Sequence, residues 1–378
     1  MPSAPNMLTN RGGDTVDPAG GVTSDVVDQL LEIEADLVVT ITMPLDRRRP
    51  GNHEDRIRLR NLLAQATQVV RDRWPAKKAN SVLNRLEAAA SRIDLAAGGH
   101  GAVLIATSED ADAHLSQFPL REAVSVGTTP ATRFLLQGLR RSPRYRVLVL
   151  SDRGTRLFEA VRDQLVEVTE HGFPLRARIV PRDRRAVAGR FALAPGRDDK
   201  ELRRNFYRDV DRALTDASRG TDAPLVIVGV RSSTALFEEV SHNAHRVIGR
   251  IDGAYDHATA RDLGVMAWPI LRERLRVRRR TVVQELQRSL AAGKAVTGID
   301  EVWQLAREGR GRLLIVEEDY EAEPSTEIDG RLVPETSGAV MSDPVDEVIE
   351  HVVRAGGAVE FVGSGALDEF GHIGLVLR

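Results

Sequence analysis

Short runs of apolar and β-branched residues constrain the fold more than any other feature of this sequence. The clearest runs are LVVTITM at 37–43, GAVLIAT at 101–107, YRVLVLS at 145–151, PLVIVGV at 224–230 and RLLIVE at 312–317. Runs this short, bounded by turn residues, predict strands. Between them apolar residues recur at helical spacing, so the sequence predicts an α/β protein. The uninterrupted run at 224–230 predicts a buried strand.

The order of these elements predicts three αβ domains, at residues 25–142, 143–283 and 284–378. Residues 1–24 are polar and rich in Gly and Pro, and we expect a disordered tail there. We expect a mixed sheet with long helices in the middle domain, which begins with three short strands separated by turn residues.

Several helix limits can also be predicted. The long middle-domain helix is expected to open at Asp198 or Asp199, and the next one to be capped by Ser232 or Ser233. A long helical pattern over residues 260–292 is expected to be interrupted near Pro269.

The last domain reads helix, strand, loop, helix, strand, strand, which predicts a small α/β/α sandwich. Asp343 is expected to cap a helix over 345–353, with Pro344 at its first position. Residues 319–338 are expected to form a flexible insertion. In the first domain, residues 119–126 are expected to form a third strand.

Charge is distributed unevenly. The net charge is −2, yet residues 284–378 hold 19 acidic and 8 basic residues. Residues 176–197 carry seven arginines and one aspartate, and residues 272–280 carry six arginines and one glutamate. Such separation predicts different partners for different parts of the chain. Arginine alone is weak evidence for nucleic acid, because the chain has 49 arginines and only 4 lysines.

Several classes of chemistry lack their motifs. The chain has no cysteine, which excludes disulfides and cysteine nucleophiles, and it has no apolar run long enough for a membrane span. No P-loop or Gly-x-Ser-x-Gly motif occurs. His242 and His245 lie three residues apart without the glutamate of a zinc hydrolase, so we interpret them as loop residues. We therefore predict no catalytic residue, metal or cofactor.

Three segments resemble a known family: YRVLVLSDRGTRLFE, PLVIVGVRSSTALFEEV and the final DPVDEVIEHVVRAGGAVEFVGSGALDEFGHIGLVLR. They are similar to the bacterial relatives of the archaeal and eukaryotic class-1 peptide-release factors, which also resemble Pelota. The resemblance covers residues 25–378. It implies that the last domain is similar to the kink-turn-binding ribosomal protein fold, which docks a GTPase in release factors, and that the middle domain presents a functional loop before a long helix.

In release factors this loop carries Gly-Gly-Gln, whose glutamine positions water against the ester bond of peptidyl-tRNA. The corresponding residues here, 182–197, contain no glutamine. We therefore do not carry peptide-release chemistry over. The charge of the loop remains, because arginines and helix-end amides both favour phosphate. The predicted RNA-binding residues are Arg182, Arg184, Arg185, Arg190 and Arg197 in the loop, and Arg203 and Arg204 on the helix.

Each charged segment has a structural alternative. The loop arginines could equally form a solvated surface, and the arginines at 276–280 are interpreted mainly as structural salt-bridge partners. The acidic residues 284–378 argue against RNA binding by that domain and favour a basic protein partner, with a role in solubility as the alternative.

These observations lead to one main hypothesis and two alternatives. The main hypothesis is a cytoplasmic, translation-associated protein that binds the ribosome or tRNA, with ribosome rescue, stress response and hibernation as its candidate tasks. The first alternative is a peptidyl-tRNA or nucleic-acid hydrolase that uses the 182–197 loop. The second is a protein-interaction scaffold without RNA contact. No DNA or membrane contact is expected.

Overall fold

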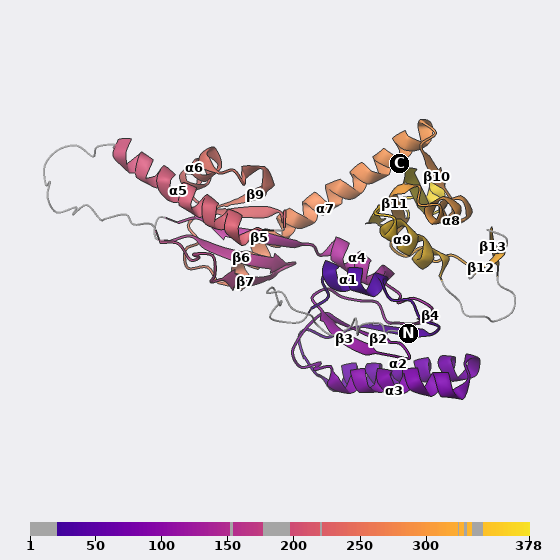
Figure 1. The fold of residues 1–378 in the computed structure, drawn as a ribbon. Coiled ribbons are helices and arrows are strands. Elements are labelled where there is room, and N and C mark those ends of the chain that lie inside the picture. Colours follow the sequence, from indigo (N-terminus) through magenta and orange to yellow (C-terminus); the bar gives the residue numbers. More distant parts are fainter. Residues whose placement is uncertain are drawn as a thin grey trace, which may run out of the picture. The chain divides into compact units, whose positions relative to one another are not determined.

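The computed structural model describes residues 21–151, 154–176, 197–219, 221–323, 325–328, 331–334 and 343–378. Its contacts form two compact units. One unit is Ser142–Val277, and the other joins Met1–Arg141 with Arg278–Arg378 (Figure 1). The predicted limits of three domains stay predictions.

The N-terminal part is built on an antiparallel sheet of order β3-β2-β1-β4. Its strands are β1 (Val38–Pro44), β2 (Gly101–Ala106), β3 (Ala111–Ser116) and β4 (Ala123–Gly127). Its helices are α1 (Ser24–Leu31), α2 (His53–Arg73), α3 (Ala76–Arg92) and α4 (Arg133–Arg141).

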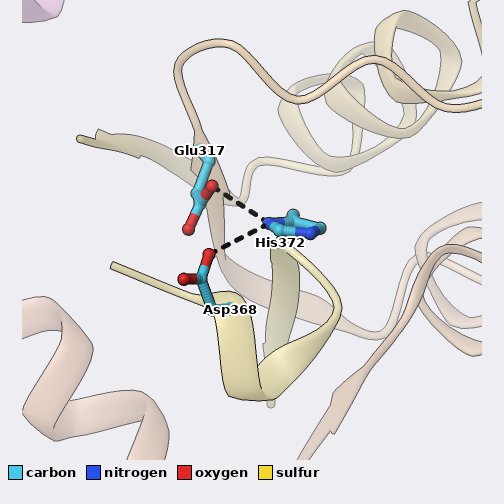
Figure 2. Close-up of side chains that lie close together, drawn as sticks. All are labelled: Glu317, Asp368 and His372. Carbon is cyan, nitrogen blue, oxygen red and sulfur yellow. Dashed lines mark hydrogen bonds and ion pairs between the residues drawn. The ribbon is translucent and has the colours of Figure 1, made fainter. Parts of the chain in front are cut away.

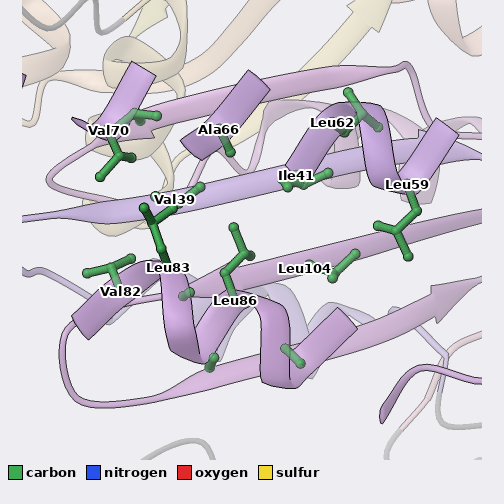
Figure 3. Packing of buried hydrophobic residues seen from close by; sticks show 14 of the residues in the cluster. Val39, Ile41, Leu59, Leu62, Ala66, Val70, Val82, Leu83, Leu86 and Leu104 are labelled. Atoms are coloured by element: carbon green, nitrogen blue, oxygen red, sulfur yellow. The ribbon is translucent and has the colours of Figure 1, made fainter. Parts of the chain in front are cut away.

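Alternate residues of this sheet face opposite helix layers. Val39, Ile41 and Leu104 pack against α2 and α3 (Figure 3). Val38 and Val103 pack on the other side with residues of α1 and α4. Because side chains alternate along a strand, one apolar run serves both layers. Residues 21–24, assigned above to the tail, are ordered: the Val22 amide donates to the Leu115 carbonyl and α1 begins at Ser24.

The middle unit contains a mixed sheet of order β7-β6-β5-β8-β9, as predicted. Its strands are β5 (Arg144–Val149), β6 (Arg156–Val161), β7 (Gln164–Val168), β8 (Leu225–Gly229) and β9 (Val247–Asp252). β5, β8 and β9 are parallel, whereas β6 pairs antiparallel with both of its neighbours, β5 and β7. Helices α5 (Arg197–Ala217) and α6 (Arg231–Val240) cover one face, and the first half of α7 (Ala260–Ala291) covers the other. The short helix η1 (Ala244–Arg246) precedes β9.

The C-terminal part is the predicted three-layer sandwich. Its sheet has the order β10-β15-β11-β14. The strands are β10 (Ala295–Thr297), β11 (Gly311–Glu317), β14 (Ala358–Val362) and β15 (Ile373–Leu377). Helices α8 (Ile299–Arg307) and α9 (Pro344–Arg354) cover one face, and Val282 and Leu286 of α7 cover the other. Asp343 caps α9 by accepting from the Val345 amide, so this predicted cap is confirmed.

Strands β3, β9 and β10 were not predicted from the sequence, and all three share one property. Each lies at an edge of its sheet. These three edge strands are only partly buried, so they can hold polar residues or remain short and do not form long apolar runs. The predicted insertion at 319–338 also contains a hairpin, β12 (Ser325–Ile328) with β13 (Arg331–Pro334). The strand predicted at 119–126 is β4, which begins only at Ala123.

Two helix predictions were wrong. α7 continues through Pro269 without interruption. Leu263, Ala267 and Leu271 are buried on both sides of the proline, and this packing holds the helix together. α6 begins at Arg231 directly after β8, so Ser232 and Ser233 lie inside the helix rather than at its cap.

Arg133 joins the two segments of the larger unit. It is the first residue of α4 and is only 1% exposed. Its Nη1 lies 2.7 Å from Oδ2 of Asp343, and its Nη2 donates to the Tyr320 carbonyl. One turn later, Gln137 Nε2 donates to the Glu318 carbonyl at 3.3 Å. The N-terminal helix α4 is thereby fixed to the segment between β11 and α9.

We expect Arg133→Met to lower the free energy of unfolding by about 3 kcal/mol, because it leaves Asp343 and backbone carbonyls without their donor. Urea denaturation followed by circular dichroism measures the loss. Arg140→Met, an exposed change on the same helix, should cost less than about 0.5 kcal/mol. Equal losses in the two variants would contradict the role given to Arg133.

Candidate functional site

The structure describes both ends of the arginine-rich segment, residues 176–197, that is predicted to be functional. Before it, Thr155 and Leu175 exchange backbone hydrogen bonds of 2.6 and 3.0 Å. After it, α5 begins at Arg197, one residue before the predicted cap. Four predicted RNA-binding residues lie outside the described residues: Arg182, Arg184, Arg185 and Arg190.

The orientation of α5 places its N-terminal end at the carboxyl edge of the parallel strands. Arg146, near the start of β5, donates from Nη2 to the Ala217 carbonyl at the last residue of α5, at 2.7 Å. The C-terminal end of α5 therefore lies at the opposite edge. With 21 residues α5 is about 30 Å long. A six-residue strand such as β5 spans about 20 Å.

The first turns of α5 therefore extend past the sheet (Figure 1). Burial agrees with this, because Leu202 is 61% exposed although it lies on the apolar face of the helix. Tyr207 is the first α5 residue of the buried core. The arginine-rich segment thus connects to a helix end that projects from the domain.

Asp211 fixes α5 to the turn before β9. This buried carboxylate accepts hydrogen bonds from the Ser241 hydroxyl, the His242 amide and both the amide and Nδ2 of Asn243. Burial alone would raise the pKa of Asp211. The donors from Ser241 and Asn243 outweigh burial and hold that pKa below its ordinary value.

The same contacts place the two histidines beside Asn243 in an exposed turn. Asn243 is buried against Asp211, whereas His242 and His245 are exposed. Nδ1 of His245 lies 2.9 Å from the His242 carbonyl oxygen. The sequence interpretation of this stretch as loop agrees with its place in a turn and in η1.

The arginines on α5 are close to carboxylates. Arg204 lies 2.6 Å from Glu239 and 3.6 Å from Glu201. Arg208 lies 3.3 Å from Glu201 as well. α5 itself has six basic and six acidic residues, so it adds no net charge to the arginine-rich segment. RNA contact by Arg203 and Arg204 stays a prediction.

In the second basic segment, residues 272–280, three of the six arginines lie close to carboxylates. Arg276 lies 3.4 Å from Glu273. Arg278 lies 2.7 Å from Glu360, and Arg279 lies 3.6 Å from Glu318. For Arg276, Arg278 and Arg279 the interpretation as structural salt-bridge partners is confirmed.

A cavity of about 560 Å³ opens at the carboxyl ends of β5, β8 and β9. Its lining residues are Leu150, Ser151, Val230, Ser233, Ala254, Tyr255, Asp256, His257 and Ala258. The strands that follow β5 in the chain, β6 and β7, lie on one side of it, and β8 and β9 lie on the other. The point between β5 and β8 is therefore a topological switch point, where α/β proteins commonly bind ligands. The projecting end of α5 lies at the same edge of the sheet.

The C-terminal sandwich contains a cluster that sequence reasoning missed. Glu317, Asp368 and His372 converge from the end of β11, from the short helix η2 (Asp368–Phe370) and from the residue before β15 (Figure 2). Asp368 and His372 are four residues apart, a signal that the sequence offered. Glu317 is distant in the sequence, and only the sheet brings it there.

A comparison with family models finds a match for the middle of the chain. Residues 144–310 match the model of the bacterial archaeo-eukaryotic release factor family 3. Over these residues the chain is release factor-like. The resemblance stated from the sequence is therefore confirmed over this segment, which includes α5 and the arginine-rich residues.

Solved structures show weaker similarities to this chain. The archaeal translation termination factor aRF1 is 16% identical, over 94% of this chain and 96% of its own, with a TM-score of 0.26. Archaeoglobus fulgidus Pelota is 12% identical over 93% and 92%, with a TM-score of 0.32. Archaeal Pelota, from a model of ribosome-bound Pelota and ABCE1, is 11% identical over 95% of each chain, with a TM-score of 0.43. The similarity of residues 144–310 to release factors therefore rests on the family match.

A search of curated proteins finds no match. Among the helices that the structure describes, none combines the length and the apolar character needed for a membrane span.

We expect Asp211→Ala to lower the free energy of unfolding by about 3 kcal/mol, because several buried donors lose one acceptor. Because folding lowers the pKa of Asp211, its charged form stabilises the protein above about pH 4 and this contribution is lost at lower pH. Denaturation at several pH values should show that Asp211→Asn lacks this acid-side loss. Asp209→Ala, an exposed change on α5, is the control. If Asp209→Ala lowered the free energy of unfolding as much as Asp211→Ala, the role of Asp211 in fixing α5 would be contradicted.

Proposed function

We propose that this protein is a cytoplasmic, translation-associated factor that binds the ribosome or tRNA through its arginine-rich segment without Gly-Gly-Gln peptide release. Its candidate tasks are ribosome rescue, stress response and hibernation. The observation that carries the proposal is the release factor family match over residues 144–310. Within this match, residues 176–197 have a net charge of +6 and contain no glutamine.

The geometry of α5 supports the same function. The arginine-rich segment joins a helix whose N-terminal turns project beyond the sheet, where a phosphate backbone can approach without contacting the core. The positive end of a helix dipole and arginine side chains both attract phosphate. Since the α5 arginines have nearby carboxylates, most of the affinity for RNA is assigned to residues 176–197.

The acidic third domain is proposed to face a basic protein. Several of its acidic side chains are internal, such as Glu318 and Glu360, which pair with arginines. Asp300, Glu301 and Glu369 are exposed instead. Carboxylates at the surface repel phosphate and attract basic protein surfaces.

Reversal of the loop charge tests RNA binding. We expect the triple variant Arg184→Glu, Arg185→Glu, Arg190→Glu to co-sediment with ribosomes at least about tenfold less than the wild type. Because each lost phosphate contact also removes counterion release, the salt dependence of the remaining binding should become shallower. Sedimentation through sucrose at several salt concentrations measures both effects.

The matched control reverses three exposed basic residues of the acidic domain, Arg288, Lys294 and Arg310. This control should retain ribosome binding. Equal loss in both triple variants would indicate a general charge effect. Unchanged binding by the loop variant would favour a scaffold without RNA contact.

We expect no hydrolysis of peptidyl-tRNA above background, because residues 182–197 have no glutamine to position water. Release of a labelled peptide should be equal for the wild type and for a variant lacking residues 182–196. Faster release by the wild type would instead support the hydrolase alternative.

A further inference from the structure

Most of the fully buried acidic residues that the structure describes have an arginine partner or, like Asp211, several hydrogen-bond donors. Among the described residues those with such partners are Asp55 with Arg58, Glu318 with Arg141 and Arg279, Glu350 with Arg354, Glu360 with Arg278, and Asp211 with its hydrogen-bond donors. Glu317 differs from the glutamates in this set because its side-chain partners are a backbone amide and a histidine. It is 4% exposed, and no arginine or lysine pairs with it in the part of the chain that the structure describes.

The partners of Glu317 do not supply a permanent charge. Its Oε1 accepts from the Leu367 amide at 2.5 Å, and its Oε2 lies 3.1 Å from Nδ1 of His372. A second carboxylate, that of Asp368, lies 3.7 Å from the same nitrogen. An imidazole is charged only when protonated, so two carboxylates here share a partner that can be neutral. Burying a carboxylate without a compensating cation is costly.

We propose that Glu317, Asp368 and His372 bind one divalent transition-metal ion, of which Zn²⁺ fits best. Imidazole nitrogen favours zinc and its neighbours in the periodic table over Mg²⁺ and Ca²⁺, and carboxylate oxygens are accepted zinc ligands. The site goes beyond the proposed RNA binding and does not depend on it.

The spacing of the three side chains suits this ion. Ligands about 2.1 Å from a tetrahedral zinc lie about 3.4 Å from one another. The distances from Nδ1 of His372, 3.1 and 3.7 Å, lie on either side of that value. All three ligand atoms lie within 4.8 Å of one another. Asp368 has a 68% exposed side chain, so it can move the small distance that coordination requires.

Such an ion would link elements that are separate in the sequence. It would tie the end of β11 to η2 and to the residue before β15 (Figure 2). Three protein ligands leave a fourth position open for water or for a side chain of a partner. The ion would also neutralise the buried charge of Glu317.

The test uses the full chain with affinity tags removed, treated with EDTA and dialysed. Isothermal titration with ZnCl₂ should show one saturable site. Asp368→Asn and His372→Asn should each weaken this binding by at least about tenfold. Asparagine is chosen at 372 because the residue has φ of +66°, a conformation that asparagine tolerates. The wild type should also bind Co²⁺ with the intense visible absorption of a tetrahedral site.

Matched controls are Asp300→Asn, an exposed aspartate of the same domain, and His245→Asn, an exposed histidine of the middle unit. Both should bind Zn²⁺ like the wild type. Circular dichroism confirms that each variant is folded. The proposal is overturned by absence of saturable binding, by unchanged binding in Asp368→Asn and His372→Asn, or by loss of binding in His245→Asn, which would assign the ion to the His242–His245 turn.

Discussion

The architecture depends on one constraint: every main sheet of this chain has two apolar faces, and both must be covered. The central strands β1, β5, β8 and β11 are buried on both sides, so each sheet requires two layers of helix. One helix, α7, meets this need twice. Its first half packs on the sheet of the middle unit, and its last turns pack on the C-terminal sheet. Pro269 lies within the first half, where buried residues on both sides of it keep α7 continuous despite the lost hydrogen bond.

Arginine has two roles in such a chain. Buried guanidinium groups at Arg133, Arg146 and Arg246 donate to backbone carbonyls and thus join segments. These groups are structural, and their number makes a simple count of arginines a poor guide to RNA binding. The pairing of Arg204 and Arg278 with glutamates points the same way. What distinguishes residues 176–197 is the excess of seven arginines over one acidic residue.

The release factor match gives that excess a functional context. α5 is anchored at its far end by Asp211 and Arg146, while its first turns extend beyond the sheet. An anchored helix whose first turns project from the sheet is a rigid support for the RNA contact proposed above for residues 176–197. The chemistry of Gly-Gly-Gln is not required for such a role.

Much of this could be predicted from sequence, and the limits have physical causes. The α/β class, the central strands and the Asp343 cap follow from local patterns, because burial on both faces demands uninterrupted apolar runs and caps are local hydrogen bonds. The resemblance to release factors could also be recognised from the sequence. β9 gave no signal because this edge strand is partly exposed and carries polar residues. Only the tertiary structure decided which arginines are paired and that Glu317 meets His372, since these contacts join residues far apart in the chain and leave no local pattern.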